Sequence, residues 1–237
     1  MISITKLYCN RSTWGDSLRY ETPFAQRKPI VVWNSTRRCN LKCVHCYSQS
    51  CNQDYEGELS TAEARTMIRD LAEFKAPVLL FSGGEPMMRP DMFELGAYAR
   101  ALGMRPVIST NGTMITRSVA ERIKATGFAY VGISLDGVGE TNDAFRGVKG
   151  AFDAAISGFE NCLNIGQKVG LRLTLTKGNV KDLPAIVDLI EATGIPRACF
   201  YHLVYTGRGA GIVEDDLTPE ETRAALDLII DRSMDMH

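Results

Sequence analysis

Residues 78–110 read VLLFSGGEPMMRPDMFELGAYARALGMRPVIST and contain two short apolar runs separated by a helical stretch. Val78 to Ser82 and Pro106 to Thr110 have the length and apolar composition of buried β-strands. Residues 91–103 have the length of a helix and end at Gly103, the residue type that most often closes a helix. A strand, a helix and a second strand in this order predict two parallel strands joined by a crossover helix.

The same alternation continues on both sides of this unit. Further strands are predicted at Ile30 to Trp33, Tyr130 to Leu135, Val169 to Thr176 and Ala198 to Val204. Further helices are predicted near 116–126, 151–166 and 180–193, and two more begin at the capping boxes Ser60 with Glu63 and Thr218 with Glu221. The sequence therefore predicts an α/β fold of six strand-helix units around a parallel sheet.

The position of the polar segments distinguishes an open sheet from a barrel. Polar and glycine-rich sequences follow the first, second, third, fourth and sixth predicted strands. They would meet over the carboxyl ends of many strands, as they do in barrels, so we expect a partial TIM barrel with (β/α)6 architecture. Residues 1–28 show no apolar period and are predicted to be an N-terminal arm, and residues 29–237 to be one core domain.

Composition excludes several kinds of partner. The chain has 27 Lys and Arg residues, 28 Asp and Glu residues and a formal net charge of -1, so no overall field would attract nucleic acid or an anionic membrane. No apolar run approaches the roughly 20 residues that span a bilayer. The odd number of cysteines, 7, and an opening MISITKLYC without signal-peptide character lead us to expect a cytoplasmic location.

The segment TRRCNLKCVHCYSQSC, residues 36–51, follows the first predicted strand and contains the spacing CxxxCxxC at Cys39, Cys43 and Cys46. Three thiolates this close can hold one metal centre, and a cubane iron-sulfur cluster with three protein ligands would keep one iron open. Three alternatives remain at this point. The cysteines could be buried small hydrophobes, they could bind structural zinc with His45, or Cys51 could be a fourth cluster ligand.

These motifs together resemble those of the radical SAM (S-adenosylmethionine) superfamily, whose hallmark is CxxxCxΦC, with His45 at the usually aromatic position Φ. Ser82-Gly83-Gly84-Glu85-Pro86 resembles the family's GGEP motif, and STNG at 109–112 and SLDG at 134–137 resemble its segments beside SAM. The resemblance implies a 4Fe-4S cluster on Cys39, Cys43 and Cys46 that cleaves SAM reductively. It places the following residues at the cofactor: His45, Gly83, Gly84, Glu85, Thr110, Asn111, Ser134, Asp136 and Arg146.

Particular roles follow from the same resemblance. The GGEP motif would bind the SAM amino group through a backbone carbonyl and Glu85. Ser134 and Arg146 would bind the SAM carboxylate, and Asp136 would contact the ribose. Turn chemistry and a surface ion pair are the alternatives for these residues.

A closer resemblance, carried by VVWNSTRRCNLKCVHCY, LFSGGEP, VISTNGT, GISLDG, NDAFRGVKGAF and CFYHLVYTGRG, is to the heme-biosynthesis branch of this superfamily. It implies removal of acetate side chains from didecarboxysiroheme to give iron-coproporphyrin, with heme d1 side-chain modification or peptide modification as alternatives. It also implies an electron donor such as flavodoxin or ferredoxin. Members usually continue into a C-terminal region with an auxiliary cluster, before which these 237 residues end.

A tetrapyrrole with several carboxylates requires local cations. Arg37, Arg38 and Arg208 are the leading candidates for binding it, and Lys42 and Arg172 also lie on or near predicted strand ends. Solvated surface charge is the alternative for each. His202 could reach iron or a carboxylate, although a histidine on a strand is more often a packing residue.

Overall fold

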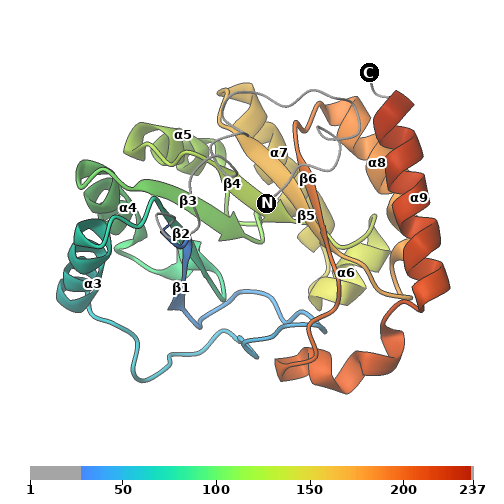
Figure 1. Cartoon of the computed structure of the whole chain (residues 1–237), viewed down its shortest axis with the longest axis horizontal. Coiled ribbons are helices and arrows are strands. Elements are labelled where there is room, and N and C mark those ends of the chain that lie inside the picture. Colours follow the sequence, from blue (N-terminus) through green and yellow to red (C-terminus); the bar gives the residue numbers. More distant parts are fainter. Residues whose placement is uncertain (1–27, 236–237) are drawn as a thin grey trace.

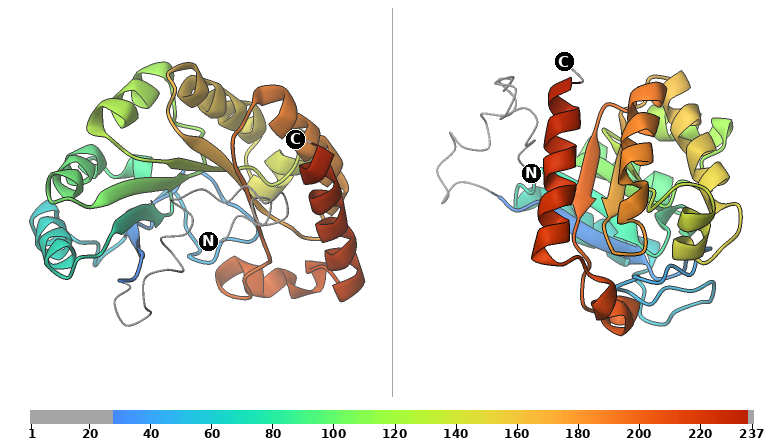
Figure 2. Two further views of the ribbon diagram at one scale, coloured as in Figure 1. Left: turned by 45° about the horizontal axis from the view of Figure 1, so that its top comes forward. Right: turned by 90° about the vertical axis from the view of Figure 1, so that its right-hand side faces the viewer.

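The computed structural model describes residues 28–235, so the predicted arm lies outside the described residues except for Lys28. Six strands form one parallel sheet in the order of the sequence. They are β1 Val31–Thr36, β2 Val78–Gly83, β3 Arg105–Thr110, β4 Val131–Ser134, β5 Val169–Thr174 and β6 Ala198–Tyr201. The sheet is strongly curved, and no described residue joins β1 to β6 (Figures 1 and 2). The expected partial barrel is confirmed.

Helices cover the outer, convex side of this sheet (Figure 2). The α-helices are α3 Thr61–Glu73, α4 Met92–Ala101, α5 Arg117–Thr126, α6 Glu140–Arg146, α7 Ala151–Asn164, α8 Leu183–Thr193 and α9 Pro219–Asp235. Three 3₁₀ segments lie between them: η2 Pro86–Met88, η3 Val180–Asp182 and η4 Gly207–Asp215. None of the described helices is long and apolar enough to cross a bilayer.

Local sequence signals explain most helix ends. Ser60 and Glu63 exchange the two hydrogen bonds of a capping box at the start of α3, and Thr218 and Glu221 do so before α9. Gly127 and Gly194 close α5 and α8 with φ of 88° and 68°, in the left-handed region. Both predicted capping boxes are therefore confirmed.

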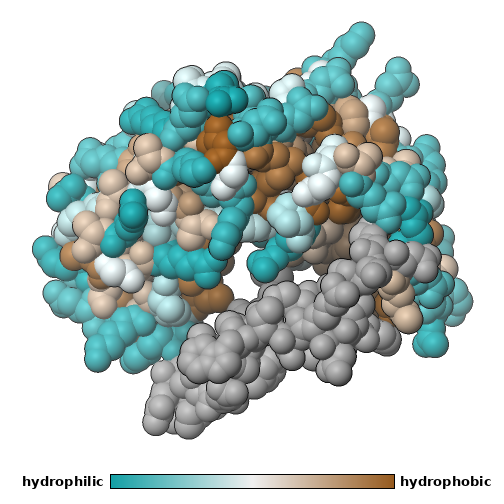
Figure 3. All heavy atoms as spheres, turned by 90° about the horizontal axis from the view of Figure 1, so that it is seen from above, coloured by the Kyte–Doolittle hydropathy of each residue, from teal (hydrophilic) through white to brown (hydrophobic). Residues whose placement is uncertain are grey.

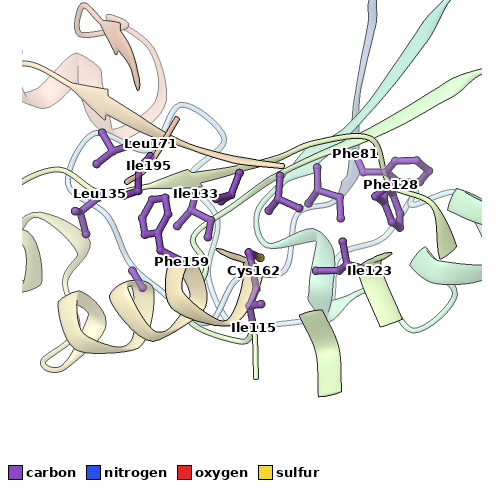
Figure 4. Close-up of a cluster of buried hydrophobic side chains, with 14 of the residues drawn as sticks. Phe81, Ile115, Ile123, Phe128, Ile133, Leu135, Phe159, Cys162, Leu171 and Ile195 are labelled. Atoms are coloured by element: carbon purple, nitrogen blue, oxygen red, sulfur yellow. The ribbon is translucent and has the colours of Figure 1, made fainter. Parts of the chain in front are cut away.

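The main core lies between the sheet and the outer helices. Alternate strand residues such as Phe81, Ile133 and Leu171 are fully buried there; Phe81 packs against Phe128, and Ile133 and Leu171 lie near Phe159 of α7 (Figure 4). Viewed from above, hydrophilic residues dominate the outer surface and hydrophobic residues show between them (Figure 3). The remaining strand residues face the inner side of the barrel.

Three strand ends differ from the predictions by two residues or more. β1 runs to Thr36 rather than Trp33, because its polar second half pairs with β2 although it carries no apolar signal. β5 ends at Thr174 rather than Thr176, since the Asn179 side chain accepts a hydrogen bond from the Thr176 backbone and turns the chain. β6 likewise ends at Tyr201 rather than Val204.

Candidate functional site

The cysteine loop, residues 37–51, follows β1 and crosses over α6. Cys39 and Cys43 are buried beside Leu41 and Ala151, and Cys46 packs against them. Backbone hydrogen bonds from Lys42 to Arg146, 3.1 Å, and from Val44 to Phe145, 2.9 Å, fasten the loop to the last residues of α6. The predicted ligands therefore share one short, anchored loop.

Each of the three sulfurs has polar neighbours that can donate to it. They are Leu41 N (3.4 Å) and Asn111 Nδ2 (3.9 Å) at Cys39, Arg146 Nη1 (3.7 Å) at Cys43, and Ser50 N (3.4 Å) and Ser48 Oγ (3.3 Å) at Cys46. Donors aimed at sulfur are typical of thiolates that bind iron-sulfur clusters. Ser48 and Ser50 were not among the predicted site residues. Only their position, two and four residues after Cys46, could have indicated them.

The three thiols differ in acidity without a bound metal. Burial raises the pKa of Cys39 to about 12 and also raises the pKa of Cys43, where the Arg146 charge opposes the shift. Burial acts on Cys46 in the same direction, but hydrogen bonds from Ser48 and Ser50 outweigh it and lower its pKa. A bound metal centre would replace the thiol protons, and its positive charge would offset the cost of burying the three thiolates.

Gly83 and Gly84 bring the loop after β2 against the cysteine loop. The backbone of Gly83 has φ of +128°, and a Cβ atom there would lie 2.1 Å from the Thr36 carbonyl oxygen. A Cβ atom at Gly84 would lie 2.3 Å from the Arg38 carbonyl oxygen. Only glycine permits this approach.

Glu85 follows Gly84 in the sequence and is fully buried. Its Oε1 accepts hydrogen bonds from Met87 N at 3.0 Å and Thr110 Oγ1 at 2.7 Å, and its Oε2 accepts from Asn111 N at 2.8 Å. Burial raises its pKa, and these hydrogen bonds oppose the shift. Glu85 thus ties the loops after β2 and β3 together.

Asp136 and Arg146 form a buried ion pair beside Cys43. Thr174 N donates to Asp136 Oδ1 at 2.7 Å, and the Asp136 backbone N–H donates to Asn142 Oδ1 at 2.9 Å. Burial disfavours the charged form of Arg146, but Asp136 and Cys43 outweigh burial and raise its pKa. The guanidinium therefore stays charged next to a predicted ligand.

His45 contacts Phe145 of α6 and Asp136 of this ion pair. Its ring lies 4.6 Å from the Phe145 ring centroid, and its Nε2 lies 3.9 Å from Asp136 Oδ2. Burial lowers the pKa of His45 to about 4, so the imidazole is neutral at pH 7. Within residues 28–235 no three His, Cys, Asp or Glu side chains are grouped as ligands of a single metal ion.

The sequence family described as the radical SAM superfamily matches residues 33–190. The chain belongs to the radical SAM superfamily. Members of this superfamily bind a 4Fe-4S cluster and SAM.

This radical SAM chain has curated relatives that are longer than itself. It is 56% identical over 100% of its length to Fe-coproporphyrin III synthase of Methanosarcina barkeri, of which it covers 62%. It is 49% identical over 94% of its length to pre-heme d1 synthase of Dinoroseobacter shibae, of which it covers 56%. The mycofactocin maturase MftC of Mycobacterium tuberculosis is 38% identical over 78% of the chain, which covers 47% of that protein. The chain thus spans roughly half to three fifths of these proteins.

Solved structures share the fold of this radical SAM chain. The structure of anSMEcpe with bound AdoMet has a TM-score of 0.72 at 20% identity, covering 85% of this chain and 59% of that one. Streptococcus suis SuiB with S-adenosylmethionine has a TM-score of 0.71 at 20% identity, covering 85% and 46%. These likenesses support the partial barrel.

The donor set of the radical SAM chain fits a 4Fe-4S cluster. Each cysteine of such a cluster binds a different iron, so the three sulfurs need not converge on one point. Buried polar atoms without a hydrogen-bond partner gather around the loop, namely His45 Nδ1, Arg146 Nε and Arg208 Nη2. Such atoms are rare in folded proteins, and they indicate a site that holds further groups.

The other described cysteines are not grouped with the three predicted ligands. Cys162 lies on α7 and is buried in the core (Figure 4). Cys199 lies on β6. Cys51 is closer, since its carbonyl oxygen accepts a hydrogen bond from Cys39 N at 3.0 Å, but its thiol sits 3.9 Å from the carbonyl oxygen of Gln49.

The predicted substrate arginines are all engaged by the cysteine loop or its surroundings. Arg37 Nε donates to the Ser48 carbonyl oxygen at 2.9 Å. Arg38 pairs with Asp54 at 3.2 Å and lines a surface pocket of about 310 Å³ between the cysteine loop and α3. Arg208 donates to backbone carbonyl oxygens of the cysteine loop. Lys42 and His202 are exposed.

Proposed function

We propose that the chain is the radical SAM core of an enzyme that modifies side chains of an iron tetrapyrrole, removing acetate side chains of didecarboxysiroheme to give iron-coproporphyrin. The observation that carries the proposal is the 56% identity to Fe-coproporphyrin III synthase along the whole chain. Pre-heme d1 synthase, at 49%, supports the same substrate class. Identity to the mycofactocin maturase MftC is lower, at 38%.

Cys39, Cys43 and Cys46 would hold the cluster, and the burial of Cys39 and Cys43 would help to exclude water from it. When bound, a 4Fe-4S cluster of this kind supplies the electron that cleaves SAM reductively. Asn111 would keep its amide directed at Cys39, because Asn40 accepts its second hydrogen bond at 2.8 Å. Arg146 would hold a positive charge at Cys43 and at the SAM carboxylate.

The remaining predicted SAM residues would act through the loops that they fix. Gly83 and Gly84 would expose backbone carbonyls to the SAM amino group, as the family motif implies. Glu85 would set the position of Thr110 and Asn111 through its three hydrogen bonds, whether or not it also touches SAM. Ser134 and Asp136 lie at the carboxyl end of β4 and just after it, the end where barrels place their chemistry.

The test is anaerobic incubation of the full-length protein with SAM, a reductant and didecarboxysiroheme, followed by mass analysis. We expect 5'-deoxyadenosine together with a tetrapyrrole lighter by its acetate groups. A heme d1 type of change in mass would move the protein to the second branch. Deoxyadenosine formation that only a peptide stimulates would assign it to the peptide-modifying class. We also propose a cytoplasmic location and a flavodoxin or ferredoxin as the electron donor.

A further inference from the structure

The inner face of β4, β5 and β6 carries a second group of functional side chains. Leu171 and Leu173 of β5 are fully buried against the outer helices, so alternation places Arg172 between them on the inner face. Its guanidinium carbon lies 4.7 Å from the ring centroid of Tyr201 on β6. Tyr130, directly before β4, is also a neighbour, since a Cβ atom at Gly132 would lie 2.7 Å from Arg172 Cδ and 3.4 Å from Tyr130 Cε1. We call Tyr130, Arg172 and Tyr201 the inner-face cluster.

Arg172 has no anionic partner on this face. It is half-buried, and among the described residues it forms no ion pair and makes no hydrogen bond of good geometry. The described neighbouring side chains supply no carboxylate. The guanidinium carbon of Arg197 lies 5.5 Å from the Tyr130 ring centroid, and Cys199 is the register partner of Arg172 on β6. A partly desolvated guanidinium without an acceptor is unfavourable in an otherwise complete fold.

Two buried hydroxyl groups beside Arg172 are also unsatisfied. Among the described residues, the buried hydroxyl oxygens of Tyr130 and Tyr201 have no hydrogen-bond partner. The Tyr201 hydroxyl lies close to the side chains of Arg172 and Cys199 and interacts with both, but neither contact has good hydrogen-bond geometry. Buried polar groups are normally paired, so three neighbouring unpaired groups indicate a missing ligand.

Two glycines make room for the cluster. Gly132 and Gly170 are register partners in the middle of the sheet, where glycine is normally disfavoured. A Cβ atom at Gly132 would lie 2.7 Å from Arg172 Cδ, and one at Gly170 would lie 2.2 Å from the Tyr130 hydroxyl oxygen. The bare backbone lets both side chains lie close against the sheet.

We propose that the inner-face cluster binds a carboxylate side chain of the substrate, with Arg172 supplying the charge and the two tyrosine hydroxyls donating hydrogen bonds. This inference rests on the proposed function. A guanidinium flanked by two hydroxyls matches the two oxygens of a carboxylate. SAM also has a carboxylate, and Ser134, which the family motif implies would bind it, is the register partner of Arg172 on β4. The cluster has no described contact with the cysteine loop, whereas Arg146 contacts Cys43, so we assign the SAM carboxylate to Arg146 and test this assignment by SAM titration.

The test measures binding of iron coproporphyrin III, a tetracarboxylate, and of its neutral tetra-amide to full-length protein. The Soret band reports both titrations at fixed salt, and a separate titration gives the SAM dissociation constant. Arg172→Met should weaken tetracarboxylate binding by about tenfold or more, because a charge-assisted contact is lost. Arg172→Lys should recover part of it, and tetra-amide and SAM binding should stay within about twofold.

Tyr130→Phe and Tyr201→Phe separate binding from folding. Each removes a hydroxyl that has no partner in the fold, so thermal stability should be unchanged or higher while tetracarboxylate affinity falls about threefold or more. Arg223→Ala, at an exposed site on α9, is the matched charge control and should bind like the wild type.

The outcomes distinguish the two levels of the proposal. If the wild type binds the tetracarboxylate and Arg172→Met binds it with the same affinity, the carboxylate site is wrong but the proposed function is not affected. A fall in SAM affinity with unchanged tetracarboxylate affinity also overturns it, because the cluster would then serve the cofactor. Failure of the wild type to bind any tetrapyrrole overturns the proposed function itself.

Discussion

Arg208 Nε donates a hydrogen bond of 2.7 Å to the carbonyl oxygen of Cys43, across 165 positions of the sequence. Its backbone N–H donates to the Cys46 carbonyl oxygen at 2.9 Å, and its Nη1 donates to that of Ser50 at 3.1 Å. Gly207, with φ of +61°, packs so closely that a Cβ atom would lie 2.3 Å from the Tyr47 carbonyl oxygen. The loop after β6 therefore fastens the loop after β1, in a barrel whose first and last strands do not pair.

Replacing Arg208 by glutamine should loosen the cysteine loop. Three hydrogen bonds hold the loop through this residue, and two of them use the guanidinium. We expect the reconstituted variant to release iron to a chelator several times faster than the wild type. The unfolding free energy of the metal-free protein should fall by about 1 to 3 kcal/mol. Normal iron retention with lost tetrapyrrole binding would instead support the substrate role predicted from the sequence.

Glu85→Gln should destabilise the protein as well as weaken SAM binding. The amide oxygen can replace Oε1 and accept from Met87 and Thr110, but the amide nitrogen then faces the Asn111 N–H as donor against donor. The cost is about 1 to 3 kcal/mol of unfolding free energy, measured by urea denaturation. SAM affinity should fall by about tenfold. Unchanged stability would show that Glu85 is not needed to tie the two loops.

The fold was largely predictable because its core uses the simplest sequence signal. Alternate residues of most strands point into the outer core, and several helices begin at a capping side chain or end at a glycine, as α3, α5 and α8 do. The misplaced end of β1 falls on Asn34, Ser35 and Thr36, which are polar although they belong to the sheet. α6 went unpredicted, since it has only seven residues and its N-cap, Gly139, has no side chain that could make a capping hydrogen bond.

The site was predictable where the chemistry is local and unpredictable where it depends on distant contacts. The cysteines follow from spacing within one loop. Arg208 was predicted to bind substrate. Its hydrogen bonds to carbonyl oxygens of the cysteine loop could not be predicted, because that loop lies about 165 positions away in the sequence. The unpaired hydroxyl groups of Tyr130 and Tyr201 could not be predicted either, because tyrosines on strands usually belong to the core.

The cysteine replacements test the three-ligand cluster. Cys39→Ala, Cys43→Ala and Cys46→Ala should each abolish or strongly reduce the iron bound after anaerobic reconstitution. Cys162→Ala and Cys199→Ala should keep it, because these thiols lie in the core and on the sheet. Cys51→Ala is the decisive control, since its backbone rather than its thiol contacts Cys39. Loss of iron in Cys51→Ala would mean four protein ligands.

The buried pair of Asp136 and Arg146 allows a sharper test of SAM binding. Arg146→Met alone leaves the Asp136 carboxylate buried without its cation, which should cost about 3 to 5 kcal/mol of unfolding free energy. Asp136→Asn with Arg146→Met removes both charges and should recover much of that loss. Both effects are measurable by denaturant unfolding of the metal-free protein.

SAM affinity in the wild type, Arg146→Met and the double variant then separates a binding role of Arg146 from a structural one. Arg146 Nε is buried without a partner and Nη1 lies 3.7 Å from Cys43 Sγ, so the guanidinium has donors left for a carboxylate. If it binds SAM, the double variant should regain stability but remain about tenfold or more weaker in SAM affinity, because the charge is still absent. If Arg146 only neutralises Asp136, SAM affinity should return together with stability, and the carboxylate role would then have to move to another residue.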